Sequence, residues 1–93
     1  MKIPSEKLRE RLSELIEKPL GKLRDPEELE MVLRRRLTKK EFKLFVAELE
    51  EVPMEDVMDK LKLDEERRRE LSANTRQKVN QDKIKRELYK AEV

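Results

Sequence analysis

The chain has 93 residues, of which 49% are charged and 35% hydrophobic, and its 24 basic and 22 acidic residues leave a net charge of +2. A chain of this length forms one small domain with a modest core, so nearly every apolar side chain is needed for packing. It lacks cysteine and histidine and has a single glycine. These absences exclude disulfides, thiolate metal sites, the usual nucleophile–base pairs and glycine-rich phosphate loops.

We therefore expect a protein that is not an enzyme and that uses no metal or other cofactor. Carboxylates are abundant, but they lie on charged helix faces where nothing equips them as an acid–base pair. No apolar run is long enough to cross a membrane, and the N-terminus has no apolar signal core. We expect a cytoplasmic protein.

The first helix is predicted over residues 5–18, with Ser5 as its N-cap, and Pro19 and Gly21 end it. One apolar stripe follows it at helical spacing: Leu8, Leu12, Leu15 and Ile16. We expect residues 1–24 to form an N-terminal helix and linker, and residues 25–93 to form a helical domain. The stripe packs back on the next helices in a monomer, which we favour, or pairs with a second copy in a homodimer.

The second helix is predicted over residues 26–36. Asp25 is placed to cap it, Pro26 suits its first position, and Glu28 completes a capping box. Its inward face carries Leu29, Val32 and Leu33. The arginine run 34–36 occupies the last turn, where cations favour the helix dipole.

The sharpest local pattern is Thr38-Lys-Lys-Glu41, a capping box that starts a third helix over about residues 39–51. Its apolar face is formed by Phe42, Phe45, Val46 and Leu49. Residues 52–53 form a short joint to a fourth helix over residues 54–61. Because this joint is short, the two helices must pack against each other at an angle.

Residues 65–90 carry a weaker pattern. Leu71, Thr75 and Val79 repeat at a step of four, and the next apolar residue, Ile84, breaks this register with a step of five. Either one long helix with a weak middle or two helices with a joint near residues 72–74 fits this segment. The fold class is all-α, a small domain of four to five helices with a helix-turn-helix-like core.

Residues 29–64 resemble the helix-turn-helix of region four of bacterial sigma factors and of related response-regulator output domains. The resemblance rests on the opening Leu37-Thr38-Lys-Lys-Glu41 and on a second set of matches: Glu55, Asp56, Val57, Leu61, Leu63 and Asp64. Leu29 and Leu33 suit the preceding helix of that family. The chain departs from it at Met58, where the family has a small alanine, and at Lys62, which is often glycine. The resemblance implies a DNA-binding transcription regulator whose recognition helix begins near Glu65.

Two interpretations follow for the segment after Glu65. In the first, DNA is contacted by the arginine run Arg67, Arg68 and Arg69, or by a displaced segment of types that contact base edges: Asn74, Thr75, Arg76, Gln77 and Lys78. In the second, the scaffold has lost DNA binding and serves as a protein–protein interaction module. The arginines are also spaced to pair with Glu65, Glu66 and Glu70 within one helix.

Overall fold

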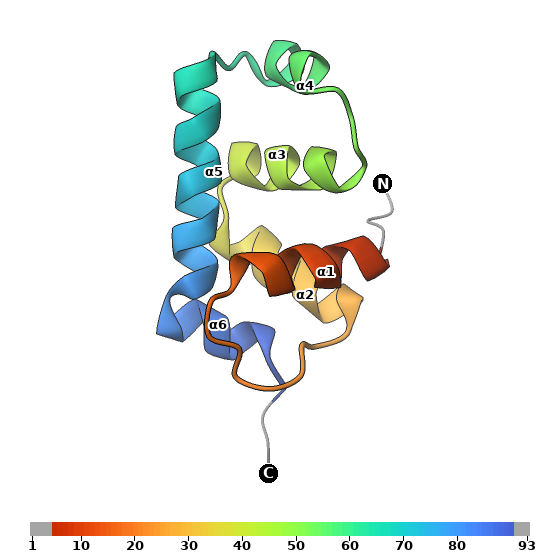
Figure 1. Cartoon of the computed structure of the whole chain (residues 1–93), viewed down its shortest axis with the longest axis vertical. Coiled ribbons are helices and arrows are strands. Elements are labelled where there is room, and N and C mark those ends of the chain that lie inside the picture. The colour runs from red at the N-terminus through yellow and green to blue at the C-terminus, as the bar shows by residue number, and fades with distance from the viewer. Residues whose placement is uncertain (1–4, 91–93) are drawn as a thin grey trace.

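Six α-helices make up the computed structural model, which describes residues 5–90 (Figure 1). They are α1 (Ser5–Leu15), α2 (Pro26–Arg36), α3 (Lys39–Leu49), α4 (Met54–Leu61), α5 (Glu65–Asn80) and α6 (Asp82–Leu88). Within residues 5–90 there is no strand, and a single isolated bridge pairs Leu23 with Tyr89. The all-α class is confirmed, with six helices where four to five were expected.

Side-chain caps explain the starts of α3 and α5. The Thr38 Oγ1 accepts from the Glu41 backbone N–H at 3.2 Å, and the Glu41 carboxylate accepts from the Thr38 N–H at 2.9 Å, so the expected capping box of α3 is present. Asp64 caps α5 by accepting from the Arg67 N–H at 2.7 Å. Asp25 occupies the expected N-cap position of α2 and Pro26 begins the helix, but the Asp25 side chain makes no capping hydrogen bond there.

The last part of the chain is two helices, but their joint is not where the sequence placed it. Residues 72–74 lie inside α5, and the break comes at Gln81, whose extended backbone separates α5 from α6. The five-residue step from Val79 to Ile84 explains this position. A straight helix would turn Ile84 away from the core, whereas the bend at Gln81 lets both side chains be buried.

The main cluster is the hydrophobic core shared by α1, α2, α3, α5 and α6. Its buried members are Leu8, Leu12, Ile16, Leu29, Val32, Leu33, Leu37, Phe45, Leu49, Val79, Ile84, Leu88 and Tyr89. The α1 stripe is therefore buried within one chain, in the same core as side chains of α2, α3, α5 and α6. A homodimer through this stripe would require α1 to leave the core.

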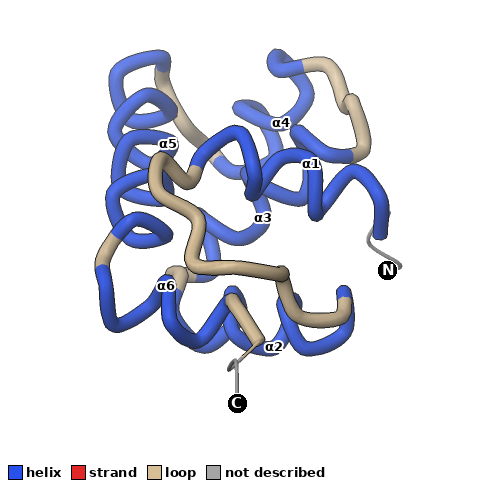
Figure 2. Tube along the Cα trace, turned by 60° about the horizontal axis from the view of Figure 1, so that its bottom comes forward, coloured by secondary structure: helices blue, strands red, loops and turns tan. Residues whose placement is uncertain are grey.

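A second, smaller cluster holds α4 against α3 and the start of α5. Its buried members are Leu44, Val57, Leu63 and Leu71, and around them lie half-buried apolar side chains: Ala47, Val52, Met54, Met58 and Leu61. We call this the α4 cluster. In Figure 1 it occupies one end of the long axis, with α5 running down the side of the molecule and α6 at the other end. The connection between α1 and α2 passes beside α6, as Figure 2 shows.

Candidate nucleic-acid interface

The arginine run of α5 is engaged within its own helix. Arg67 pairs with Glu70 at 2.8 Å, Arg69 pairs with Glu65 at 3.2 Å, and Arg68 forms a close pair with Glu65 as well. The Arg68 guanidinium holds the pKa of the Glu65 carboxyl below its usual value. Residues 64–70 contain four carboxylates and three arginines, a net charge of −1. This stretch therefore does not attract a phosphate backbone on balance.

The displaced segment 74–78 presents only part of itself to solvent. The Thr75 side chain is buried and its hydroxyl donates to the Leu71 carbonyl at 3.0 Å. Asn74 is half-buried. Arg76 and Gln77 are exposed, so the segment offers two of its five side chains on an open helix face.

Lys78 has a structural partner that the sequence did not indicate. Its ammonium lies 2.6 Å from an oxygen of Glu41, whose residue is only 2% exposed. Burial alone would raise the pKa of the Glu41 carboxyl, but the hydrogen bonds from Lys78 and Thr38 outweigh it and lower that pKa. Lys78 therefore ties α5 to α3, and it is not free to contact a ligand without losing this bond.

The arginines at the end of α2 also have partners inside the chain. Arg36 makes two hydrogen bonds to the Glu87 carboxylate, at 2.6 and 2.8 Å, and Arg35 reaches the same group at 3.3 Å. Arg34 pairs with Glu30 and lies 4.8 Å from the centre of the Phe42 ring. Their partners on α6 and α3 show that this run joins helices, in addition to favouring the dipole of α2.

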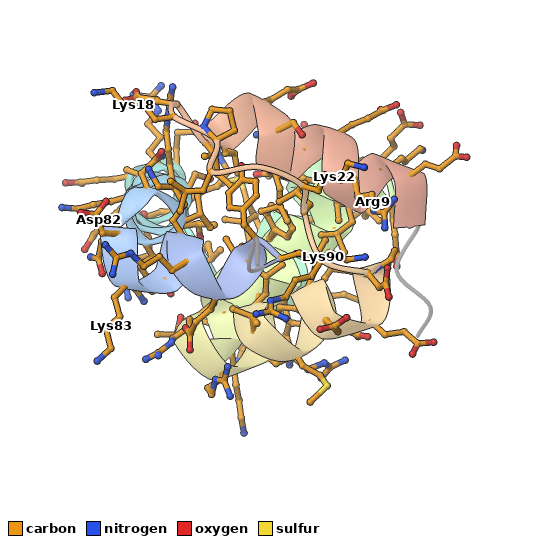
Figure 3. All side chains as sticks on the ribbon, turned by 90° about the horizontal axis from the view of Figure 1, so that it is seen from below. Arg9, Lys18, Lys22, Asp82, Lys83 and Lys90 are labelled. Atoms are coloured by element: carbon orange, nitrogen blue, oxygen red, sulfur yellow. The ribbon has the colours of Figure 1, made fainter. Side chains whose placement is uncertain are left out.

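A group of cations that the sequence analysis did not single out comes together at the α6 end of the molecule. We call it the basic face: Arg9, Lys18, Lys22, Lys83 and Lys90 (Figure 3). Asp82 lies beside Lys83 on the same side of the molecule. Lys18, Lys22 and Lys83 form no ion pair with any residue of the described range. The first 24 residues and the chain after Arg76 are separate basic stretches in the sequence, and folding brings them together.

Asn80 holds the two stretches in contact. Its amide nitrogen donates to the Leu15 carbonyl at 2.8 Å and to the Arg76 carbonyl at 2.9 Å, and its oxygen accepts from the Glu17 N–H at 2.9 Å. These bonds fix the end of α1 beside the end of α5, which brings Lys18 toward the start of α6. Arg76 lies one turn before Asn80 on the same side of α5. No pattern in the sequence indicates this link, because its partners are more than 60 residues apart.

Across residues 5–90 no group of three or more acidic side chains is arranged to hold a metal ion. In the same range no helix is both long and apolar enough to cross a membrane. Comparisons with protein-family models, with curated proteins and with solved structures found no match to this chain.

Proposed function

We propose that this chain is a small, non-enzymatic regulatory protein that binds duplex DNA through the basic face and the adjoining end of α5. The observation that carries the proposal is that Lys18 and Lys83, from opposite parts of the sequence, both lie at the α6 end of the molecule, on either side of Asp82 (Figure 3). Neither lysine forms an ion pair with a described residue. Unpaired, exposed lysines gain most from phosphates, because no internal pair has to be broken.

Within this proposal α5 supplies base contacts from its C-terminal half. Arg76 and Gln77 are exposed there, and both types can donate to base edges in the major groove. A sigma-like helix-turn-helix remains part of the proposal as a scaffold. In support, α3 and α4 are consecutive helices joined by a short connection, and α5 follows them. The contact region shifts from the start of α5, where the acidic residues lie, to its end.

Fluorescence anisotropy of a labelled duplex, followed as salt is raised, tests the proposal. We expect binding at about 50 mM salt with a steep loss as salt increases. The double variant Lys18→Gln/Lys83→Gln should reduce the slope of log affinity against log salt by about 2, because each phosphate contact contributes about 0.9. The matched control is Lys43→Gln/Lys60→Gln, which removes the same charge beside α4. Absence of binding, or equal loss in both double variants, would overturn the proposal.

A groove beside α4 supports a second candidate, the protein–protein interaction module. The groove has a volume of about 340 Å³ and lies between α3 and α4, with Ala47, Val52 and Leu61 on its walls. These side chains are half-buried in a chain that is short of apolar residues. An apolar side chain of a partner would be withdrawn from water in this groove, which favours its binding there.

The second candidate predicts that the groove takes up a neutral apolar dye such as Nile red. Leu61→Lys should abolish the dye fluorescence, while Leu20→Lys, which alters an exposed leucine outside the groove, should leave it unchanged. A dye signal that both variants reduce equally, or no signal, would count against an accessible groove.

A further inference from the structure

A cleft opens on the basic face between α1, the connection that follows it and the C-terminal segment. Its volume is about 430 Å³, and its walls include Arg9, Ser13, Gly21, Lys22, Tyr89 and Lys90. This volume lies within the range of sites for small organic ligands. The cleft could therefore hold a molecule of about mononucleotide size.

A backbone hydrogen bond holds together the segments that carry two of the three cations in this cleft, Lys22 and Lys90. The Lys90 N–H donates to the Lys22 carbonyl at 2.9 Å, beside the bridge that joins Leu23 to Tyr89. Arg9 approaches from α1, so the three positive side chains come from three separate segments (Figure 3). Because the fold holds these like charges together, an anion bound among them would relieve their repulsion.

The Asp25 carboxylate lies within ion-pair distance of two of these cations. It lies 3.7 Å from Arg9 and 3.5 Å from Lys90, and it makes no capping bond to α2 although Asp25 occupies the N-cap position. An aspartate at this position ordinarily accepts from the first free N–H groups of its helix. Its side chain is 62% exposed, so this one solvated carboxylate pairs only weakly with Arg9 and Lys90 and does not neutralise the three cations of the cleft.

The walls of the cleft match a phosphate group joined to a larger body. Ammonium and guanidinium groups, as in Lys22, Lys90 and Arg9, are the donors that form charge-assisted hydrogen bonds to phosphates in proteins. Gly21 has φ of 143° and no side chain, which leaves room in the cleft. The buried ring of Tyr89 supplies an apolar wall. We infer that this cleft is a binding site for a phosphate monoester, with the phosphate held among Arg9, Lys22 and Lys90.

This inference goes beyond DNA binding and stands without it. The DNA proposal is carried by Lys18 and Lys83, whereas the cleft uses the other cations of the same basic face. A phosphate monoester comes from a free nucleotide or from the terminal phosphate of a nucleic acid. Adenosine 5′-monophosphate and adenosine form one pair of ligands that tests the first source. A short duplex with and without 5′-phosphates forms a second pair that tests the other.

Isothermal titration of the full chain with these ligands tests the site. We expect saturable binding of adenosine 5′-monophosphate with a dissociation constant below about 1 mM, and none of adenosine. Lys22→Gln should weaken binding about tenfold, because one charge-assisted hydrogen bond is lost. Lys60→Gln, a control beside α4, should leave it unchanged. A further outcome also supports the site: the 5′-phosphorylated duplex binds, Lys22→Gln weakens that binding, and adenosine 5′-monophosphate does not bind. The ligand is then the terminal phosphate of a nucleic acid.

Asp25→Asn supplies a gain-of-function test. Asparagine is also a good N-cap, so α2 should keep its start while the competing carboxylate disappears. We expect this variant to bind adenosine 5′-monophosphate several times more tightly, which a purely structural role of Asp25 would not produce. The proposal is overturned if no phosphate monoester binds, if Lys22→Gln and Lys60→Gln weaken binding equally, or if Asp25→Asn leaves it unchanged.

Discussion

The main cluster and the α4 cluster differ in how many side chains they bury and in how completely those side chains are buried. The main cluster draws side chains from five helices, and Leu12, Leu29, Leu33, Val79 and Leu88 are fully enclosed. The α4 cluster has four buried members, surrounded by side chains that are only half-buried. In a chain with 35% hydrophobic residues, the apolar material is concentrated at one end. Burial, and therefore stability, is distributed unevenly along the long axis.

Each end also carries a different surface. Around α4 the half-buried side chains form the apolar groove between α3 and α4. At the α6 end the core is closed, and its exterior carries the basic face and the cleft. A fully packed core holds surface charges in fixed positions, which anion binding requires, whereas a looser cluster suits a surface that adapts to an apolar partner.

The largest expected effect compares one substitution at the two ends. Leu33 is 0% exposed in the main cluster, and Leu33→Ala should cost about 3 kcal/mol of unfolding free energy through lost burial and a cavity. Leu61 is half-buried in the α4 cluster, and Leu61→Ala should cost about 1 kcal/mol. Urea unfolding followed by circular dichroism measures both. Equal losses would mean that the two clusters are packed alike, contrary to the comparison.

The second effect concerns Glu41, which lies between the two ends. Glu41→Gln removes the charge that Lys78 and Thr38 stabilise and should cost about 2 kcal/mol at neutral pH. Because folding lowers the pKa of this carboxyl, its contribution is present above the ordinary pKa of about 4.5 and is lost as pH falls through the lowered value.

Unfolding free energies measured from pH 7 to pH 3 check the sign of this dependence. The wild-type protein should lose more stability than Glu41→Gln over that interval. Glu10→Gln, a charge change at an exposed position of α1, serves as control and should follow the wild type. Parallel curves for Glu41→Gln and the wild type would show that the Glu41 carboxylate contributes nothing to this pH dependence.

Helix caps and helix bounds could be predicted from the sequence, because they depend on neighbours within a few residues. The capping box at Thr38, the cap at Asp64 and the bounds of α2 and α4 agree with the structure because each depends on side chains within a single turn. The partners of Lys78 and Asn80 depend on how α3 and α1 cross α5. Helical periodicity does not contain that information.

The candidate site was harder to predict than the fold for the same reason. Thr75 and Lys78 have residue types suited to base contacts, but one is buried and the other is paired with Glu41. Asp25 fits the pattern of a cap, yet two distant cations draw its carboxylate away. Packing decided the place of Thr75, and charges distant in the sequence decided those of Lys78 and Asp25. Only the fold brings these neighbours into range.

The third effect tests the link that assembles the basic face. Asn80→Ala removes three hydrogen bonds, two of which join α5 to the end of α1, and should cost about 1 to 2 kcal/mol. Amide exchange should speed up at Glu17 and its neighbours while the amides of α4 keep their rates. Asn74→Ala, in the middle of α5, is the control and should leave the end of α1 protected. Unchanged exchange at Glu17 would show that other contacts hold α1.

The smallest effect concerns the two connections of α4. Glu51 precedes it with φ of 58° and Lys62 ends it with φ of 56°, and a side chain disfavours this left-handed conformation. Lys62→Gly should therefore stabilise the protein by about 0.5 to 1 kcal/mol, because relief of the steric cost exceeds the entropy that glycine adds to the unfolded chain. Lys60→Gly, inside α4, should destabilise it by about 1 kcal/mol. Thermal unfolding distinguishes the two signs. If Lys62→Gly also destabilises, then Lys62 contributes contacts worth more than its backbone strain, and the α4 end is held more firmly than its burial indicates.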